Sequence, residues 1–216
     1  MNTADTTPGV AVLVFGDARV PGRLNGLRIR RADGPADSAA IDEAIGPHRR
    51  LVVVGGDADL AAVLTRLLRA ERLDVEVAYV PRRRTAATRV YRLAAGRRAA
   101  RRARRGTARR VPLIRDETGS AIVGRASWRP AEDRIHGEAV VDDTALFDGD
   151  VAGLDIEPTL AVPGLRARTQ GGRWITGRAV QLGSTGVVVV RDGVPAPRAA
   201  RRSTFYRHVE GWLLVG

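Results

Sequence analysis

Residues 51–60, with the sequence LVVVGGDADL, constrain the fold of this chain more than any other segment. The apolar run from Leu51 to Val54 is typical of a buried strand, and Gly55 and Gly56 let the backbone turn sharply. Asp57 then begins a predicted helix with an apolar stripe at three-to-four spacing, formed by Leu60, Ala61, Val63, Leu64, Leu67 and Leu68. The sequence therefore predicts a strand, a glycine turn and a helix.

This turn is also a candidate phosphate site. Glycines allow a ligand to approach the backbone, and the exposed N–H groups at the start of a helix favour an anion. Any α/β protein needs tight turns between strands and helices, so a purely structural role for the turn stays open.

The positive charge of the chain is concentrated in one segment. The formal net charge is +12, yet residues 82–110 carry 13 of the 36 basic residues and no acidic one, which leaves 23 basic against 24 acidic residues elsewhere. Such local basicity predicts contact with a phosphate-bearing ligand, an anionic membrane surface, nucleic acid or an acidic partner protein. All the basic residues are arginines, so a P-loop lysine and a Schiff-base lysine are excluded.

Length and composition favour a folded protein. The 216 residues, 44% of them hydrophobic, suffice for one large or two small domains. The chain has no cysteine, and His48, His136 and His208 lack a second ligand at metal-binding spacing, so we expect no zinc site and assign no metal-ligating residues. No apolar run approaches the roughly 20 residues of a membrane span, and the first residues do not read as a signal peptide. We expect a cytoplasmic location, with peripheral membrane contact left open.

The first half of the chain alternates strands and helices. After a flexible tail at residues 1–8, strands are predicted at 10–15, 27–30, 51–54 and 75–79, with a helix at 39–45 capped by Asp37 or Ser38 and another from Asp57. This order predicts an open, mostly parallel sheet. In such sheets ligands bind at the carboxyl ends of the strands, where loops 55–59 and 82–88 would lie.

The arginine-rich segment is predicted to be helical. Residues 85–105 are mostly alanine and arginine, which favours a helix by propensity. Residues 97–110 have only alanine on their less charged face, whereas interfacial membrane helices normally offer Trp, Phe or Leu, so deep insertion into lipid is not expected. We interpret residues 97–110 as the end of this helix and a link between two domains.

The second half changes to short strands separated by turn residues. Strands are predicted at 121–128, 135–141, 154–157, 173–182, 186–191 and 211–215. The sequence thus predicts an α/β nucleotide-binding-like domain at residues 9–96 and an all-β, sandwich-like or barrel domain at residues 111–216.

In this order, the Gly55-Gly56-Asp57 turn, the loop that opens with Pro81 and the C-terminal β domain resemble the diacylglycerol kinase catalytic-domain family. That family includes bacterial lipid kinases and sphingosine kinases and is distantly related to NAD kinases. The resemblance implies the same two-domain fold, with ATP and Mg²⁺ as cofactors. It implies that the nucleotide or phosphate lies against Gly55, Gly56, Asp57, Asp59, Arg82, Arg83, Arg84 and Thr85.

Both loops depart from the family pattern. The first loop usually reads Gly-Gly-Asp-Gly-Thr, and here Ala58 and Asp59 take the last two positions. The second usually reads proline, an apolar residue and Gly-Thr-Gly-Asn-Asp, whereas here residues 82–84 are all arginine. Guanidinium groups suit bidentate contact with phosphate, but they also fill the space that glycines leave for a nucleotide. We therefore predict an eroded ATP site.

A second candidate for catalysis lies late in the chain. Residues 187–194, VVVVRDGV, resemble the strand that leads to the family's Asp-Gly-Glu, whose acidic residues are implicated in activating the lipid hydroxyl. Asp192 and Gly193 match, and Val194 replaces the glutamate. Because Asp-Gly between two β runs is also a strong hairpin signal, Asp192 is either catalytic, together with Asp57, or a turn residue.

Three other groups of residues have structural interpretations. Residues 183–186 lack the spacing of a nucleophile elbow and are predicted to form a turn. Trp128, Trp174 and Trp212 are expected to pack in cores. The acidic residues of the second half do not match a Ca²⁺ loop and are interpreted as solvated turns: Asp142, Asp143, Asp148, Asp150, Asp155 and Glu157.

The sequence supports three functions in order. The first is a lipid-kinase-like protein with an eroded ATP site that binds a nucleotide or anionic lipid with little or no catalysis. The second is an active ATP-dependent lipid kinase. The third is a nucleic-acid-binding protein that uses the segment between Arg82 and Arg110, ranked last because no nucleic-acid-binding motif accompanies the charge. Exposed strand edges leave a homodimer open.

Overall fold

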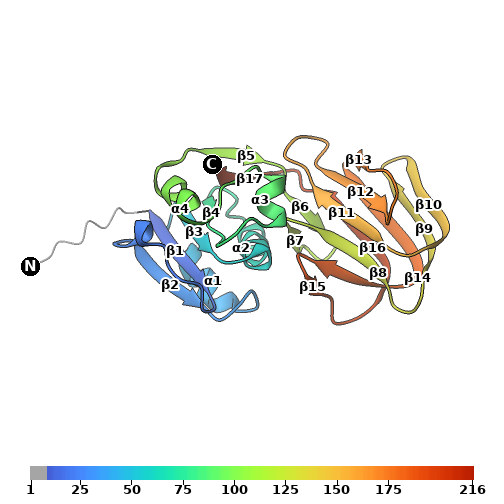
Figure 1. Cartoon of the computed structure of the whole chain (residues 1–216), viewed down its shortest axis with the longest axis horizontal. Coiled ribbons are helices and arrows are strands. Elements are labelled where there is room, and N and C mark those ends of the chain that lie inside the picture. Colours follow the sequence, from blue (N-terminus) through green and yellow to red (C-terminus); the bar gives the residue numbers. More distant parts are fainter. Residues whose placement is uncertain (1–8) are drawn as a thin grey trace, which may run out of the picture. The chain divides into compact units, whose positions relative to one another are not determined.

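The computed structural model describes residues 9–216, which form two compact units (Figure 1). The predicted tail at residues 1–8 lies outside the described residues. The first unit comprises residues 9–111 together with Gly211–Gly216, and the second comprises Pro112–Glu210. The last strand thus returns to the first unit, where Trp212 is fully buried and meets Tyr91 edge-on, with ring centroids 5.3 Å apart. The domain boundaries predicted from the sequence had placed this strand in the β domain, although residues 211–215 also resemble the strand that ends members of the diacylglycerol kinase family and returns to their first domain.

The first unit contains one six-stranded sheet in the order β2-β1-β3-β4-β17-β5. Its strands are β1 (Val10–Phe15), β2 (Arg28–Ala32), β3 (Arg50–Val54), β4 (Glu76–Tyr79), β5 (Ala108–Val111) and β17 (Trp212–Val215). All neighbours pair in parallel except β5, which runs antiparallel to β17. The predicted open and mostly parallel sheet is confirmed.

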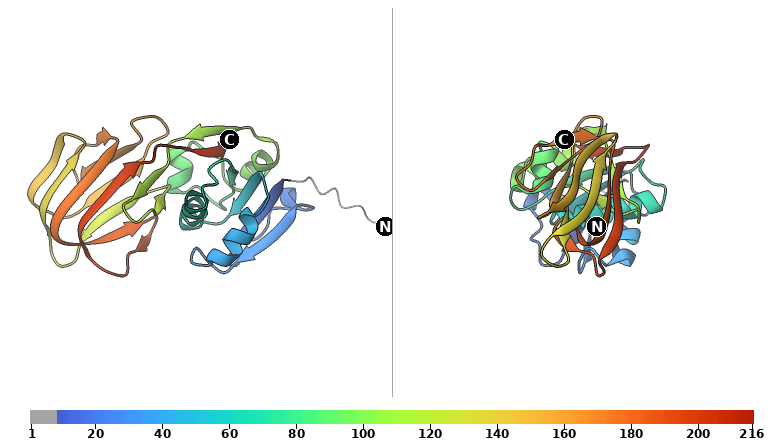
Figure 2. Two further views of the ribbon diagram at one scale, coloured as in Figure 1. Left: turned by 180° about the vertical axis from the view of Figure 1, so that it is seen from behind. Right: turned by 90° about the vertical axis from the view of Figure 1, so that its right-hand side faces the viewer.

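Helices cover both faces of this sheet (Figure 2). They are η1 (Gly22–Leu24), α1 (Ser38–Ile45), α2 (Asp57–Arg69), α3 (Ala86–Val90) and α4 (Gly96–Arg105). Helix α1 begins as predicted, because the Asp37 side chain accepts a hydrogen bond from the Ala40 N–H at 3.1 Å. Helices α1 and α2 pack together, whereas α4 packs with η1 and β4.

The single helix predicted for residues 85–105 is wrong, because the chain forms α3 and α4 with a turn between them. Tyr91 and Leu93 are buried in this turn, and Arg92 adopts a positive φ of 56°. Gly96 also has a positive φ, and its N–H donates to the Pro81 carbonyl at 2.8 Å. Burial of the two apolar side chains outweighs the helix propensity of the alanines and arginines.

Residues 97–110 also differ from the predicted link between domains. Most of them form α4, whose Ala99, Ala100 and Ala103 are buried against the sheet, and the last ones form β5 in the same unit. Alanine is small enough to let the helix approach the strands closely. Because the alanines occupy the face toward the sheet, the arginines of α4 lie on the other face, and all of them are exposed.

The second unit is one eleven-stranded antiparallel sheet. Its strands are β6 (Ile114–Asp116), β7 (Ala121–Ile122), β8 (Ala126–Pro130), β9 (Ile135–Val141), β10 (Thr144–Val151), β11 (Leu154–Pro158), β12 (Leu165–Thr169), β13 (Ile175–Gly177), β14 (Ala179–Arg191), β15 (Val194–Pro195) and β16 (Ala200–Arg207). Strand β14 organises the sheet, since its first half pairs with β9, its second half with β8, and both halves with β16.

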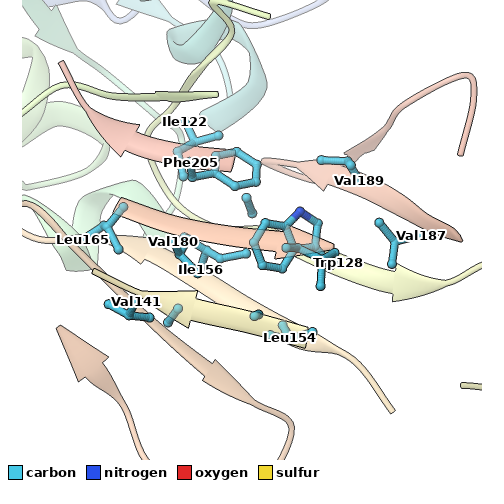
Figure 3. Packing of buried hydrophobic residues seen from close by; sticks show 14 of the residues in the cluster. Ile122, Trp128, Val141, Leu154, Ile156, Leu165, Val180, Val187, Val189 and Phe205 are labelled. Atoms are coloured by element: carbon cyan, nitrogen blue, oxygen red, sulfur yellow. The ribbon is translucent and has the colours of Figure 1, made fainter. Parts of the chain in front are cut away.

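One apolar core fills the second unit (Figure 3). Trp128 and Phe205 lie at its centre with their ring centroids 5.9 Å apart, and both are fully buried. Leu165 of β12, near one end of the strand order, and Ile122 of β7, at the other end, belong to the same cluster, so the sheet bends over on itself. The predicted all-β domain with a sandwich-like core is confirmed.

Several local predictions in this unit are wrong. Residues 183–186 are not a turn but part of β14, where a bulge between Gly183 and Val187 shifts the pairing with β16. Trp174 is outside the core, and its ring contacts the guanidinium groups of Arg166 and Arg168, each 4.4 Å from the ring centroid. Strands β10, β12 and β16 were not predicted, because their many polar residues hide the alternation of the few that are buried.

The acidic residues of this unit are not all solvated turns. Asp155 and Glu157 lie on β11 and are buried. Asp155 pairs with Arg129 at 3.1 Å, and Glu157 pairs with Arg125 and Arg166, each at 2.7 Å. These carboxylates are buried because arginines on neighbouring strands neutralise them.

Candidate functional site

The first unit has a large cavity at the carboxyl ends of three adjacent parallel strands. Its volume is about 1080 Å³, and Phe15, Val54 and Val80 line it at the ends of β1, β3 and β4. We call it the strand-end cavity. Its position follows from topology, because parallel neighbours bring the loops that follow them to one edge of the sheet.

The predicted glycine turn forms one wall of this cavity. Gly55 and Gly56 connect β3 to α2, and Gly56 is the N-cap residue of the helix. The Gly56 N–H donates to Asp59 Oδ2 at 2.7 Å, so a carboxylate of the first helical turn covers the N–H that an anion would use. Burial raises the pKa of Asp59, although the hydrogen bond from Gly56 opposes this rise.

Asp57 is not part of the cavity lining. Its carboxylate accepts hydrogen bonds from Tyr79 Oη at 2.8 Å and from the Ala87 N–H at 3.1 Å. It therefore ties the start of α2 to the end of β4 and to α3. Burial raises the pKa of Tyr79, and the nearby charge of Asp57 and its hydrogen bond raise it further, so the phenol stays protonated and donates to the carboxylate.

The second predicted loop forms the opposite wall. Arg82, Arg83 and Thr85 line the cavity, whereas Arg84 is exposed and outside the lining. Thr85 begins α3: its hydroxyl accepts from the Thr88 N–H at 3.2 Å, and the Thr88 hydroxyl accepts from the Thr85 N–H at 2.8 Å. This reciprocal cap holds the loop at the cavity.

The structure adds residues that the sequence analysis missed. Asp17 and Arg19 line the cavity from the loop after β1, and Gly96 and Arg97 line it from the first turn of α4. Because β1 and β3 are parallel neighbours, the loop after β1 lies at the same sheet edge as the glycine turn, and this rule could have indicated Asp17 and Arg19. The second pair depends on the break between α3 and α4, which local propensity did not indicate.

The lining of the strand-end cavity has an excess of positive charge. Arg19, Arg82, Arg83 and Arg97 face two carboxylates, Asp17 and Asp59. None of these arginines forms an ion pair with a carboxylate of residues 9–216. Within the same residues, no three His, Asp or Glu side chains gather into a group able to hold a metal ion. The cavity thus suits an anion, with phosphate the natural match for its guanidinium groups.

Asp192 belongs to the second unit and forms the turn between β14 and β15. Asp192 and Gly193 have positive φ angles of 47° and 88°, as a tight hairpin turn requires. The Asp192 carboxylate accepts hydrogen bonds from the N–H groups of Val123, Gly124 and Arg125 at 3.0, 2.7 and 2.9 Å. Asp192 therefore holds the loop before β8 as well as the turn.

No helix in the described part of the chain is long and apolar enough to cross a membrane. No protein-family model matches the sequence, and none of the curated proteins matches it significantly.

Solved structures, in contrast, match the chain along nearly its whole length. A candidate diacylglycerol kinase from Bacillus anthracis strain Sterne superposes with a TM-score of 0.76 at 10% sequence identity, covering 96% of both chains. A diacylglycerol kinase from the same organism gives a TM-score of 0.74 at 9% identity, again over 96% of each chain. An NAD kinase from Archaeoglobus fulgidus in complex with ATP gives 0.65 at 12% identity over 96% of this chain and 93% of its own. The resemblance predicted from the sequence is thereby confirmed for the fold, which this chain shares with diacylglycerol kinase-like proteins and NAD kinase.

Proposed function

We propose that this chain binds a nucleotide or another phosphate-bearing ligand in the strand-end cavity, with phosphoryl transfer weak or absent. The main support is the cavity itself, about 1080 Å³ at the edge of the sheet where α/β proteins bind ligands. Pockets for small ligands typically measure about 300–1,000 Å³, so the cavity has room for ATP. The neighbour described in complex with ATP makes ATP the first ligand to test.

The residues divide this task between two walls. Gly55 and Gly56 add no side chain of their own to one wall, so a phosphate has only the Asp59 carboxylate to displace before it reaches the Gly56 N–H. Arg82 and Arg83 on the other wall supply guanidinium groups in place of the glycine-rich loop of the family, and these donate paired hydrogen bonds to phosphate oxygens. Arginine in this loop thus favours phosphate binding by side chains.

The contacts of the two candidate catalytic carboxylates argue against efficient catalysis. Phosphoryl transfer depends on positioning the acceptor and on neutralising charge around the phosphates. The two carboxylates proposed for catalysis already accept hydrogen bonds from the protein, Asp57 from two donors and Asp192 from three. Since residues 9–216 bring together no metal-binding group of side chains, the proposal assigns no protein-held Mg²⁺ and no step depends on one.

Calorimetry with ATP, with and without Mg²⁺, tests the binding role. We expect saturable binding to the wild type and at least about tenfold weaker binding to the double variant Arg82→Gln/Arg83→Gln, which loses charge-assisted hydrogen bonds to phosphate. Arg84→Gln is the matched control, since Arg84 is exposed in the same loop but outside the lining. The proposal fails if the wild type does not bind ATP, or if the control loses as much affinity per charge as the double variant.

Two alternative functions, lipid phosphorylation and nucleic-acid binding, have separate tests. An active ATP-dependent lipid kinase is favoured by the kinase neighbours and by the retained Gly55-Gly56-Asp57 turn. Transfer of γ-phosphate to diacylglycerol that is lost in a folded Asp57→Ala variant would establish it. A nucleic-acid-binding role for residues 82–110 predicts affinity that falls steeply with salt and does not depend on nucleotide. Contact with an anionic membrane surface and homodimer formation stay predictions.

A further inference from the structure

A second cavity lies in the first unit, at the other end of α4. Its volume is about 540 Å³, and it is lined by Val10, Gly22, Arg23, Leu27, Arg101, Arg104 and Arg105. We call it the α4 C-terminal cavity. The strand-end cavity meets the first turn of α4, at Gly96 and Arg97, and shares only Gly22 with this one. The two are therefore separate binding spaces.

The lining of the α4 C-terminal cavity carries four positive charges and no negative one. Arg23, Arg101, Arg104 and Arg105 are all exposed, and none forms an ion pair with a carboxylate in the described part of the chain. Crowding like charges around a hollow costs free energy in the absence of a counter-charge. An anion with several charges removes this cost.

The end of the helix does not explain these arginines. A helix C-terminus favours nearby cations, but here the carbonyl groups of Ala103 and Gly106 accept from the Arg50 guanidinium, each at 3.0 Å. Arg50 in turn pairs with Glu76 at 2.6 Å. The last turn of α4 is thus already capped by a residue outside the cavity.

The guanidinium groups also differ in how they are held. Arg104 donates to the carbonyl groups of Arg23 and Asn25 at 3.0 and 3.5 Å, which fixes it against η1 and its C-cap residue. The side chains of Arg101 and Arg105 have no acceptor among residues 9–216, so their donors are available to a ligand. The lining contains no aromatic side chain on which a base would stack.

We propose that the α4 C-terminal cavity is a second anion site, which binds a compound with clustered phosphate groups. Arg104 is already oriented, and Arg23, Arg101 and Arg105 surround the phosphates with forked donors. The phosphates come either from a soluble polyphosphate compound or from the phosphorylated headgroup of a lipid. This site is independent of the nucleotide proposed for the strand-end cavity.

Calorimetric titration with inorganic tripolyphosphate tests the site, using the full chain and three double variants with the same change in charge. Arg101→Gln/Arg105→Gln alters the α4 C-terminal cavity, Arg82→Gln/Arg83→Gln alters the strand-end cavity, and Arg98→Gln/Arg109→Gln removes two exposed arginines outside both linings. We expect the first variant to lose one binding phase or to weaken it at least about tenfold, and the other two to retain that phase within about twofold.

Circular dichroism confirms that each variant is folded, which is expected because all six arginines are exposed. Equal weakening in the Arg98→Gln/Arg109→Gln control would reduce the effect to general charge and overturn the proposal, and so would unchanged binding in Arg101→Gln/Arg105→Gln. Failure of ATP to bind the wild type rejects only the nucleotide proposal, because it leaves the Arg101→Gln/Arg105→Gln comparison intact.

Cosedimentation with vesicles separates the two sources of phosphate. Stronger binding to vesicles with a bisphosphorylated inositol lipid than to phosphatidylserine vesicles of equal charge, lost in Arg101→Gln/Arg105→Gln, identifies a lipid headgroup. Tripolyphosphate binding without that preference identifies a soluble ligand.

Discussion

The carboxylate of Asp59 accepts a hydrogen bond from the backbone N–H of Gly56, with the two atoms 2.7 Å apart. Because Gly56 and Asp59 both line the cavity at the start of α2, the protein holds one of its own negative groups where a phosphate would bind. Asp59 occupies one of the two positions at which residues 55–59 depart from the Gly-Gly-Asp-Gly-Thr pattern of the family that the sequence resembles. Asp59 is thus an internal competitor of the proposed ligand.

Replacing Asp59 by Asn is expected to raise the affinity for ATP roughly fivefold, the equivalent of about 1 kcal/mol, because it removes a negative charge a few ångströms from the phosphates. Asn keeps an oxygen that accepts from Gly56. Calorimetry measures the change, and Glu71→Gln is the control, since Glu71 is exposed beyond the far end of α2. Unchanged affinity in Asp59→Asn would place the ligand away from the glycine turn.

The stability of Asp59→Asn relative to the wild type should depend on pH. Burial raises the pKa of Asp59 in the folded state, so protonation stabilises the fold below the ordinary value of 3.8 and this stabilisation is lost as the pH rises through the folded-state pKa. Asn cannot ionise, so its advantage should grow from about pH 3 to about pH 7. Urea unfolding at both pH values measures it, and a constant difference would contradict the prediction.

The two glycines of the turn should respond differently to alanine. A Cβ at Gly56 would lie 3.7 Å from Asp59 Oδ2, an ordinary contact, so Gly56→Ala should fold normally but bind ATP more weakly by blocking approach to the backbone. A Cβ at Gly55 would collide with the Asp59 carboxylate, so Gly55→Ala should lower the free energy of unfolding by about 1–3 kcal/mol. Thermal unfolding and calorimetry on both variants separate the two effects.

Asp192→Asn should affect stability more than ligand binding. The amide tolerates the positive φ but provides a weaker acceptor for the N–H groups of Val123, Gly124 and Arg125, so we expect a loss of about 1–2 kcal/mol in the free energy of unfolding. ATP affinity should stay within about twofold. If the variant keeps its stability but loses a measurable phosphoryl transfer, Asp192 is catalytic and the turn role is secondary.

Glu157→Gln should destabilise the chain at neutral pH and much less in acid. Burial raises the pKa of Glu157, but the hydrogen bonds and charges of Arg166 and Arg125 outweigh it and hold the pKa below its usual value of 4.5. The ionised Glu157 carboxylate, paired with both arginines, therefore stabilises the fold above pH 4.5. This contribution is lost as the pH falls through the lower folded-state pKa. We expect a cost of about 2 kcal/mol at neutral pH, measured by urea unfolding. Glu138→Gln, at an exposed position of β9, should cost little at any pH.

Local sequence patterns predicted most of the first unit. The apolar run 51–54, the glycines after it and the helical spacing from Asp57 all depend on residues adjacent in the chain, and each element appears where predicted. The same approach failed at residues 85–105, where Tyr91 and Leu93 turn into the core and divide one expected helix. Propensity adds up over neighbours along the chain, whereas burial depends on residues that are distant in it.

The sequence by itself determined the two-domain order, the parallel sheet and the glycine turn, because hydrophobic periodicity and turn chemistry act over a few residues. It also indicated Arg82, Arg83 and Asp59 as site residues, and the structure places all three in the lining of the strand-end cavity. Only the tertiary structure shows that the Asp57 carboxylate accepts hydrogen bonds from Tyr79 and Ala87. It alone places Arg97 in the lining of the strand-end cavity, and Arg23 and Arg101 together in the lining of the α4 C-terminal cavity. The positions of Arg97 and Arg101 depend on how α4 packs against the sheet. No pattern within the helix specifies which strands its alanines contact.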